Sequence, residues 1–363
     1  MARRLIATAL CGLAALLPAA PAGAATNTNE LRDELRSLVA AGVPGAIVEV
    51  RDGSRTVRMA AGLGRRSTHT SMRPSDRFRV GSVTKTFVAT VVLQLVGEGK
   101  LSLDDTVERW LPGVLPDGDQ ITIRQLLNHT SGLFDYLGDG GGALLKRWYL
   151  DRSGRVPDPR QLVGIAASHP ALFAPGSQFS YSNTGYVVLG LIVEAATGHP
   201  LTDELATRLF APLGLRATSF DTTPRIAGHH AHGYEKLGRR IRDFTAANPA
   251  WAWAAGAIVS TSDDLVRFYR ALLGGELLGP QLLEEMETTV PMGHGKGYGL
   301  GLERWTVCPD VWGHDGVVPG YENLVFSTAD GGRQLVVAFN RSGNVPTGAA
   351  PAINRLFVTA FCG

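Results

Sequence analysis

The sequence is poor in net charge and in cysteine. Its 363 residues contain 35 Lys and Arg against 33 Asp and Glu, so it lacks the basic surplus by which proteins bind the phosphate backbone of nucleic acids. Its 44 Gly and 20 Pro follow no collagen-like or heptad repeat, and 44% hydrophobic residues exclude a chain that is mainly disordered. We therefore expect a globular protein with many turns and no nucleic-acid partner.

The sequence also lacks a stretch of about 20 apolar residues that could span a bilayer. A shorter apolar run, residues 5–17, follows Arg3 and Arg4 and leads into small residues. This pattern is typical of a cleaved export signal. We expect loss of residues 1–25 and secretion of residues 26–363 as one compact unit without a membrane anchor. The arginine pair also fits a twin-arginine signal, but we favour the general secretory route.

Only three cysteines are present, and Cys11 lies within the expected signal. Cys308 and Cys362 remain, and two cysteines in an exported protein most simply form a disulfide. Closing a loop of that length stabilises a fold by roughly 4 kcal/mol in the chain-entropy model. Two unpaired buried thiols are the alternative, and the bridge is the hypothesis that we favour.

Hydrophobic spacing predicts strands from both ends of the chain and helices between them. Residues 30–41 have the spacing of an amphipathic helix, and two pairs of short strands flank Asp-Gly turns: 46–50 with 56–61, and 324–327 with 334–339. No repeat or low-complexity linker separates these segments. The pattern indicates an α+β fold, in which both ends of the chain complete an antiparallel sheet and a largely helical region is inserted in the middle.

A serine and a lysine lie one turn apart at the start of an apolar segment that ends at Val96. On a helix, Ser82 and Lys85 would share one side, so the amine could take a proton from the hydroxyl. The helix N-terminus would favour negative charge developing on Ser82. A capping serine followed by a surface lysine is the commoner meaning of such a pair. Because this segment is apolar almost all round, we expect Lys85 to be buried and its pKa to be lowered.

Two further segments offer polar side chains. Tyr181 and Asn183 are spaced to point the same way from an extended turn, so a phenol and an amide could both face Ser82; the alternative is a segment that caps the next helix. His314, as a cation, could bind an anion, and Gly316 would let a strand approach a substrate; the alternative is a histidine in a turn. Each segment alone is weak evidence for catalysis.

In this order, Ser-x-x-Lys, Tyr-x-Asn and His-x-Gly resemble the signature of the penicillin-recognising serine hydrolases. The variant is similar to that of exported soluble D-alanyl-D-alanine carboxypeptidases, which are relatives of class C β-lactamases. The likeness extends over essentially the whole chain after the signal, through residues 80–85, 126–133, 179–183, 297–302 and 361–363. It implies a five-stranded antiparallel sheet with helices on both faces, beside an all-helical region.

The resemblance implies a role for each residue of the motifs. Ser82 would be the nucleophile that forms an acyl-enzyme, and Lys85 and Tyr181 would transfer its proton. Which of these two is the base stays open. Asn183 would bind the substrate amide, and His314 would organise the Tyr181 hydroxyl.

The resemblance also implies the surroundings of the nucleophile. The backbone N–H groups of Ser82 and Val317 would form the oxyanion hole. Trp251 matches an aromatic residue that forms a wall of the cleft, although a core tryptophan fits the sequence equally well. His129 resembles a hydrogen-bonded histidine of a structural loop. The sequence contains no Gly-x-Ser-x-Gly elbow, which argues against an α/β-hydrolase.

The sequence departs from the family where the carboxypeptidases hold the free carboxylate of their substrate. Glu303 and Asp315 stand in place of the Arg and Thr that serve this purpose. Neighbouring residues of a strand point to opposite faces, so Arg304 could substitute only through a bulge. We therefore expect weak cleavage of free-acid D-Ala-D-Ala peptides and better cleavage of D-amino-acid esters, amides or substrates with an ammonium near the leaving group.

The resemblance as a whole predicts a D-Ala-D-Ala carboxypeptidase that acts on peptidoglycan stem peptides and is acylated by β-lactams. The alternatives are a D-aminopeptidase, a D-amino-acid amidase or esterase, and a β-lactamase on the same scaffold. A non-catalytic β-lactam sensor is disfavoured, because it would need neither Lys85 nor Tyr181. We expect a monomer without a cofactor. His229, His230 and His232 lack a further ligand at suitable spacing, so we expect no metal site there.

The cysteine hypothesis predicts the thiol content of the mature protein. Residues 26–363, denatured without reductant, should show no reactive thiol, because the only two cysteines would be joined to each other. Reduction should then expose two thiols per chain, counted with a thiol-reactive dye. Two reactive thiols before reduction would contradict the bridge.

Overall fold

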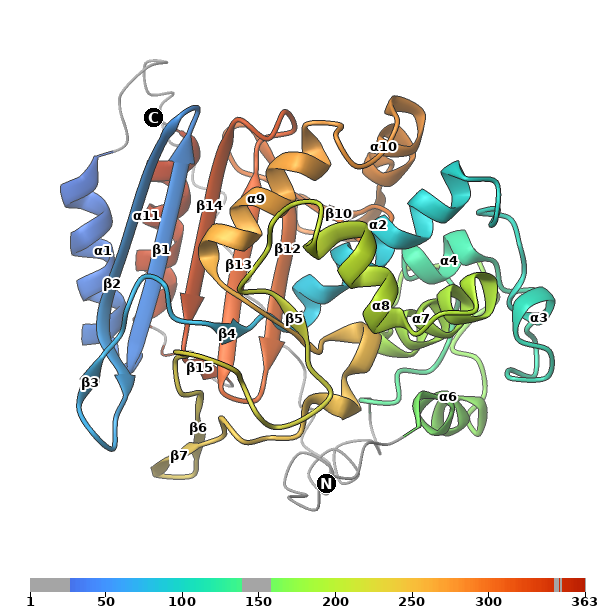
Figure 1. Ribbon diagram of the computed structural model, residues 1–363, viewed down its shortest axis with the longest axis horizontal. Helices are drawn as coiled ribbons and strands as arrows, with labels where there is room; N and C mark the ends of the chain where they lie inside the picture. The colour runs from blue at the N-terminus through green and yellow to red at the C-terminus, as the bar shows by residue number, and fades with distance from the viewer. Residues whose placement is uncertain (1–26, 139–157, 343–345, 347, 363) are drawn as a thin grey trace.

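The computed structural model describes residues 27–138, 158–342, 346 and 348–362. The expected export signal, residues 1–25, lies outside this part of the chain. One large sheet separates a pair of helices on one side from a mainly helical region on the other (Figure 1). Within the described segments, no helix is both long enough and apolar enough to cross a membrane.

A nine-stranded antiparallel sheet forms the centre, in the order β3-β2-β1-β14-β13-β12-β11-β10-β9. The predicted strand pairs are confirmed as two hairpins, β1 with β2 and β13 with β14. The first turns at Gly53, whose φ of +58° suits a residue without a Cβ. The strands are β1 (Gly45–Asp52), β2 (Arg55–Arg65), β3 (Thr70–Ser71), β9 (Val290–Gly293), β10 (Lys296–Tyr298), β11 (Glu303–Thr306), β12 (Asp310–Val318), β13 (Tyr321–Ser327) and β14 (Arg333–Phe339).

The α+β class is confirmed, but the expected number of five strands is wrong. Five strands of seven to eleven residues, β2, β1, β14, β13 and β12, form the middle of the sheet. The other four have two to four residues each and lengthen the sheet at its two edges. Segments this short do not display an alternating hydrophobic pattern, so the sequence did not reveal them.

Strand β1 pairs with β14 in continuous antiparallel register, which joins the two ends of the chain in one sheet. Consecutive residues of β14 face different cores. Val336 belongs to the core beneath α9 (Ser262–Leu273), whereas Val337 packs with α1 (Thr28–Ala40) and α11 (Ala349–Phe361). Figure 1 shows α1 and α11 side by side on the outer face of the sheet. The prediction that both ends of the chain build the sheet is confirmed.

The predicted helical insertion is also confirmed. Helix α2 is buried on almost every side, and Lys85 within it has no exposed surface. The remaining α-helices of the described residues are α2 (Thr84–Gly97), α3 (Val107–Trp110), α4 (Ile123–Leu127), α6 (Pro159–Ala167), α7 (Asn183–Thr197), α8 (Leu201–Leu205) and α10 (Pro280–Glu287). Two small sheets, β4-β8-β5 and β15-β6-β7, complete the fold with β4 (Phe78–Arg79), β5 (Ser219–Phe220), β6 (Tyr234–Leu237), β7 (Arg240–Asp243), β8 (Ile258–Ser260) and β15 (Arg341–Ser342).

A disulfide joins Cys308, between β11 and β12, to Cys362, which follows α11. Their Cα atoms are 5.3 Å apart. The bridge therefore ties the last helix to the part of the sheet that carries β12.

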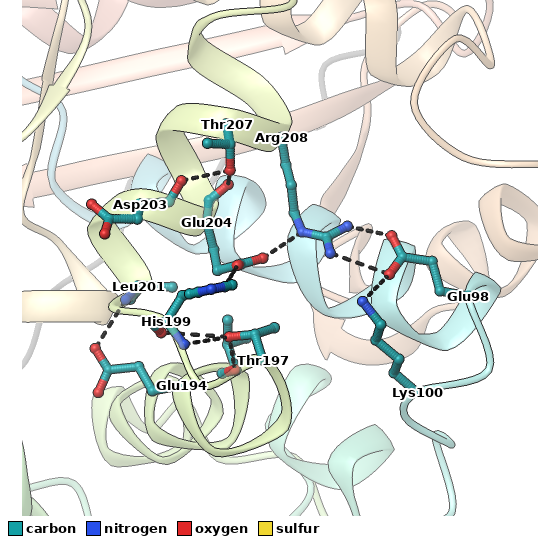
Figure 2. Close-up of polar contacts among 11 residues, drawn as sticks. Glu98, Lys100, Glu194, Thr197, His199, Leu201, Asp203, Glu204, Thr207 and Arg208 are labelled. Carbon is teal, nitrogen blue, oxygen red and sulfur yellow. Dashed lines mark hydrogen bonds and ion pairs between the residues drawn. The ribbon is translucent and has the colours of Figure 1, made fainter.

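A network of charged side chains joins the end of α2 to α8 and the π-helical turn that follows it (Figure 2). Arg208 donates to Glu204 at 2.6 Å and to both carboxylate oxygens of Glu98. Lys100 pairs with Glu98 at 2.9 Å, and His199 with Glu204 at 3.0 Å. The hydrogen bonds from Arg208 are the main reason that the pKa of Glu98 falls to about 2. Arg208 thus bridges two carboxylates, one of which, on Glu204, is largely buried.

Replacing Arg208 should destabilise the fold. Arg208→Met should lower the free energy of unfolding by about 2 kcal/mol at pH 7, because it leaves the buried Glu204 without its guanidinium partner. The control Arg36→Met breaks an exposed pair with Asp33 and should cost less than about 0.5 kcal/mol. Chemical denaturation measures both variants.

The loss of stability in Arg208→Met should depend on pH, in a direction that the lowered pKa of Glu98 determines. A carboxyl group whose pKa is lowered on folding stabilises the native state above its unfolded pKa and loses that effect as the pH falls. The difference between Arg208→Met and wild type should therefore shrink between about pH 5 and pH 2 as Glu98 is protonated. Equal stability of Arg208→Met and Arg36→Met at pH 7 would contradict this account.

Candidate active site

Ser82 and Lys85 meet at the start of α2. Gly81–Val83 form a 3-10 turn and α2 begins at Thr84, so Ser82 precedes the α-helix instead of opening it. A 3-10 turn has three residues per turn, which brings residues i and i+3 into line. The Lys85 Nζ lies 3.0 Å from the Ser82 Oγ. The amine and the hydroxyl are therefore in direct hydrogen-bond contact.

Lys85 is surrounded by oxygen atoms inside the protein. Besides Ser82, its Nζ contacts the Asn183 Oδ1 and the Ala255 backbone oxygen, each at 2.8 Å. Burial lowers the pKa of Lys85 to about 7, as the apolar helix predicts. Negative charge nearby opposes that fall, first on Asp135 and then on Asp315. At neutral pH a large fraction of Lys85 is thus a free amine, which can accept a proton from a hydroxyl.

Tyr181 closes the site beside the amine, with its ring centroid 4.9 Å from the Lys85 Nζ. Its hydroxyl is buried and makes no hydrogen bond of standard geometry with any residue that the structure describes, although the Ser82 hydroxyl is near enough to lower its pKa. Burial outweighs that effect and raises the pKa of Tyr181 well above that of an ordinary tyrosine. The phenol is therefore protonated at neutral pH and can donate to a neighbouring oxygen.

His314 lies inside β12 and meets the Tyr181 ring edge-on, but among the described residues its ring hydrogen-bonds to other partners than the Tyr181 hydroxyl. Its Nε2 is 2.9 Å from the Tyr298 hydroxyl, its Nδ1 contacts the Asp315 backbone oxygen, and its ring centroid is 6.4 Å from that of Tyr181. A carbonyl can only accept, so Nδ1 carries the proton and Nε2 accepts from Tyr298. Burial lowers the pKa of His314 to about 3. The expectation of a cationic, anion-binding histidine is therefore wrong.

Asn183 is the first residue of α7, and its amide faces Lys85 instead of the Ser82 hydroxyl. The Oδ1 accepts from Lys85 at 2.8 Å, and the Nδ2 donates to the Asp135 Oδ2 at 3.0 Å. Tyr181 and Asn183 nevertheless both reach the Lys85 amine, although α7 begins between them. One N–H of the amide remains for a substrate carbonyl.

Two glycines allow β12 to approach the turn that carries the serine. A Cβ on Gly316 would lie 2.0 Å from the Val80 backbone oxygen, and one on Gly81 would lie 2.8 Å from the Val317 nitrogen. Such distances leave no room for a side chain. Gly316 thus lets the strand contact the turn, and the expected approach of the strand to a substrate stays a prediction. The contact brings the backbone of Val317 next to the serine turn, with the Val317 side chain 49% exposed.

Glu303 and Asp315 lie on the same face of the sheet where β11 meets β12. Glu303 is 3% exposed, whereas the Asp315 side chain is 47% exposed. Burial, followed by the charge of Asp315, raises the pKa of Glu303 well above its usual value. Burial also raises the pKa of Asp315, but the charges of Lys296 and Lys85 oppose that rise. We therefore assign the proton of the pair to Glu303 and the negative charge to Asp315, which reaches solvent.

Arg304 points away from these acids, as strand alternation predicts. Its guanidinium lies 3.6 Å from the Asp310 carboxylate. The register of β11 against β12 is continuous from Glu303 to Thr306, without a bulge. Arg304 is therefore not placed to bind a carboxylate beside Glu303.

Two groups of residues that include histidine were considered as metal sites. The ligand atoms of Glu303, His314 and Asp315 lie within 4.8 Å of one another, close enough to share a cation. The histidine Nδ1, however, already contacts a backbone oxygen, and Glu303 accepts a 2.6 Å bond from Trp305. His230 stacks on His232 with ring centroids 5.4 Å apart, and the strand expected beside them, β6, begins at Tyr234.

Trp251 and His129 both lie behind the site. Trp251 is 7% exposed within the main core, and its backbone oxygen accepts a 2.6 Å bond from the Tyr136 hydroxyl. His129 is 1% exposed, and its Nδ1 accepts from the Ser182 N–H at 3.2 Å. His129 is therefore the hydrogen-bonded loop residue that the sequence predicts.

Sequence reasoning missed three contributors to this site: Asp135, Tyr298 and the backbone oxygen of Ala255. Asp135 follows the stretch 126–133 that resembles the family, and Tyr298 lies within another such stretch. Their positions next to these stretches could have marked them. Ala255 could not have been found this way, because only its backbone takes part.

The fold and the Ser82–Lys85 pair define a serine hydrolase of the penicillin-recognising type. A family model described as Beta-lactamase matches residues 31–360, and the chain belongs to this family. The resemblance drawn from the three motifs is therefore confirmed.

Relatives with assigned names fall into more than one group. The crystal structure of a D-stereospecific amidohydrolase from Streptomyces sp. superposes with a TM-score of 0.83 at 39% identity, over 93% of this chain and 99% of that one. The D-amino acid amidase from Ochrobactrum anthropi SV3 gives a TM-score of 0.82 at 29% identity, over 91% and 97%. Penicillin-binding protein 4 of Amycolatopsis lactamdurans is 32% identical, over 84% of this chain and 82% of its own length.

A fluorescent penicillin should label the protein on Ser82. The rate of labelling should rise with pH and be half-maximal near pH 7, because only the neutral form of Lys85 can take the serine proton. Intact mass should show one adduct on wild type and none on Ser82→Ala. Labelling that survives Ser82→Ala, or a rate that falls between pH 6 and 8, would contradict this account.

Proposed function

We propose that this protein is an exported serine hydrolase that works through an acyl-enzyme and prefers amides or esters of D-amino acids to peptides with a free C-terminal carboxylate. The observation that carries the proposal is the pair Glu303 and Asp315 beside the site. A carboxylate-binding site needs a cation or neutral donors there. Arg304 is directed to Asp310 instead. Lys296, whose charge acts on both acids, lies over the Trp305 ring, with its Nζ 3.5 Å from the ring centroid.

The charge of Asp315 sets the size of the effect. At about 5 Å and an effective dielectric constant of about 20, one like charge raises the free energy of a bound carboxylate by roughly 3 kcal/mol, or about a hundredfold in affinity. Glu303 adds little to this while it is protonated. An amide or ester end has no charge to repel, and an ammonium would be attracted. The site thus favours substrates that lack the terminal carboxylate.

The names of the relatives support the same choice. The Streptomyces protein is an amidohydrolase specific for D-stereochemistry, and the Ochrobactrum protein is a D-amino acid amidase. The penicillin-binding relative supports the alternative, a D-Ala-D-Ala carboxypeptidase that acts on stem peptides and binds β-lactams. We place the carboxypeptidase second, because the acid pair opposes its substrate.

The site residues provide each step of the reaction. The free amine of Lys85 takes the proton as the Ser82 Oγ attacks the substrate carbonyl, and the backbone N–H groups of Ser82 and Val317 stabilise the oxyanion. Collapse of the tetrahedral intermediate breaks the bond to the leaving amine or alcohol, which receives that proton through the Tyr181 hydroxyl. Water then hydrolyses the serine ester and restores the enzyme.

The test compares a D-Ala-D-Ala peptide with its C-terminal amide. Wild type should cleave the amide with a kcat/KM at least about tenfold higher, because the free acid meets the Asp315 charge. Asp315→Thr should reduce this preference by about tenfold or more, and Glu303→Arg combined with it should reverse the preference. Arg304→Met is the matched control, since it removes a charge on the other face of β11, and its ratio should equal that of wild type.

A wild-type preference of tenfold or more for the free acid would overturn the amidase proposal in favour of the carboxypeptidase. Turnover of a chromogenic cephalosporin distinguishes a β-lactamase from the peptidase and the amidase. A single burst fits a slowly deacylating peptidase or amidase, and a sustained rate fits a β-lactamase.

A further inference from the structure

The hydrogen bonds around Lys85 determine where its lone pair points. A neutral amine has two N–H groups and one lone pair, and Lys85 has three neighbours. The Ala255 backbone oxygen can only accept, and so can the Asn183 Oδ1. These two oxygens therefore take both N–H groups, and the lone pair is left facing the Ser82 hydroxyl at 3.0 Å. This is the geometry that a base for Ser82 requires.

That arrangement depends on the orientation of the Asn183 amide. If the amide turned over, its Nδ2 would face Lys85 as a donor, and the lone pair would be drawn to Asn183 and away from the serine. While it is ionised, Asp135 prevents the turn, because its Oδ2 accepts from the Nδ2 at 3.0 Å and a carboxylate has no proton to give the Oδ1. Burial raises the pKa of Asp135, and the hydrogen bonds that it accepts from Leu137 and Asn183 oppose that rise. The carboxylate on one side and the amine on the other thus select one amide orientation.

Asp135 is itself held firmly against the start of α7. Its Oδ1 accepts from the Leu137 N–H at 3.0 Å. Thr184, the residue after Asn183, accepts from the Tyr136 N–H at 3.1 Å and donates to the Phe134 oxygen at 2.7 Å. Residues 134–137 and the first turn of α7 are therefore clamped together, with the carboxylate between them.

Asp135 also contributes charge. Among the charged groups that raise the pKa of Lys85 against burial, Asp135 has the largest effect, ahead of Asp315. The histidines near the amine, His129 and His314, are kept neutral by burial. Loss of the Asp135 charge should thus make Lys85 easier to deprotonate.

We propose that Asp135 is a positioning residue for the serine–lysine pair, which locks the Asn183 amide so that the lone pair of Lys85 faces Ser82. Asp135 acts through Asn183 and does not contact the serine. The inference rests on the proposed function, since it takes Lys85 as the base that activates Ser82.

The variant Asp135→Asn tests the lock without changing the shape of the side chain. The side chain of Asn has one acceptor oxygen where Asp has two. In the variant, either the Leu137 N–H or the Asn183 Nδ2 therefore faces an NH₂ group instead of an oxygen. For the D-Ala-D-Ala amide, the plateau of kcat/KM at high pH should fall by about tenfold or more. The midpoint of the pH profile should move to lower pH, because the charge that raises the pKa of Lys85 is gone. Titration of the substrate's own amine cancels when variants are compared.

The double variant Asp135→Asn with Asn183→Asp exchanges the two groups. Its carboxylate at position 183 accepts from Lys85 and from the new amide at 135, whose oxygen accepts from Leu137, so every partner is satisfied again. The plateau is not expected to recover, because this exchange also removes the Asn183 N–H that was left for the substrate carbonyl. The midpoint should move above that of wild type, since the negative charge now touches the amine. If Asp135→Asn does not fold, this opposite shift carries the test.

The control is Asp33→Asn, which removes an exposed carboxylate from α1 and should leave both plateau and midpoint unchanged. Equal loss at every pH in Asp135→Asn, with an unmoved midpoint, would show a purely structural role and overturn the positioning role alone. A wild type that neither cleaves the amide nor is acylated on Ser82 would overturn the proposed function, and the inference with it.

Discussion

The burial of Lys85 is the constraint on which the rest of the site depends. An amine with no exposed surface must find all its partners inside the protein, and a helix that is apolar all round gives it no route to solvent. The partners come from three separate segments: the serine turn, the start of α7 and the backbone at Ala255. Burial lowers the pKa of the amine to about 7, and the arrangement of its acceptors directs the lone pair that burial has freed. Burial of the Lys85 amine thus determines both its basicity and the contacts that it makes.

The acidic residues around this amine differ in their exposure, and each has a different role. Asp135 is partly buried and accepts a hydrogen bond from the amide of Asn183. Glu303 is so deeply buried beside Asp315 that it stays protonated, and it packs against Trp305. Asp315 reaches solvent and presents its charge to an incoming substrate. Lys85 and Lys296 are the cations whose charges act on Asp315, and the exposed charge of Asp315 is the physical basis of the proposal that the site disfavours anionic substrates.

The sheet serves the site through close backbone contact. Strand β12 touches the serine turn at Gly316 and Gly81, where no side chain could fit, and so brings the Val317 backbone next to Ser82. The same strand holds His314, whose neutral ring bonds to Tyr298 and fills the space behind Tyr181. The pairing of β1 with β14 and the disulfide to α11 hold this part of the sheet in place from both ends of the chain.

The sequence by itself determined the features that arise from local periodicity. These include the two hairpins, the inserted helices, the contact of Ser82 with Lys85 over one turn, the burial of that lysine, and the outward direction of Arg304 on its strand. Only the tertiary structure decided which distant groups meet. His314 hydrogen-bonds to Tyr298 instead of Tyr181. Asn183 lies between Lys85 and Asp135, and Asn183 and Asp135 are 48 positions apart in the chain. Short edge strands were invisible for a related reason, since their pairing depends on neighbours and not on their own pattern. Hydrophobic periodicity and residue spacing determine structure within one helix or strand. The partner of a buried polar group depends instead on which elements pack together, because every donor and acceptor there must be satisfied.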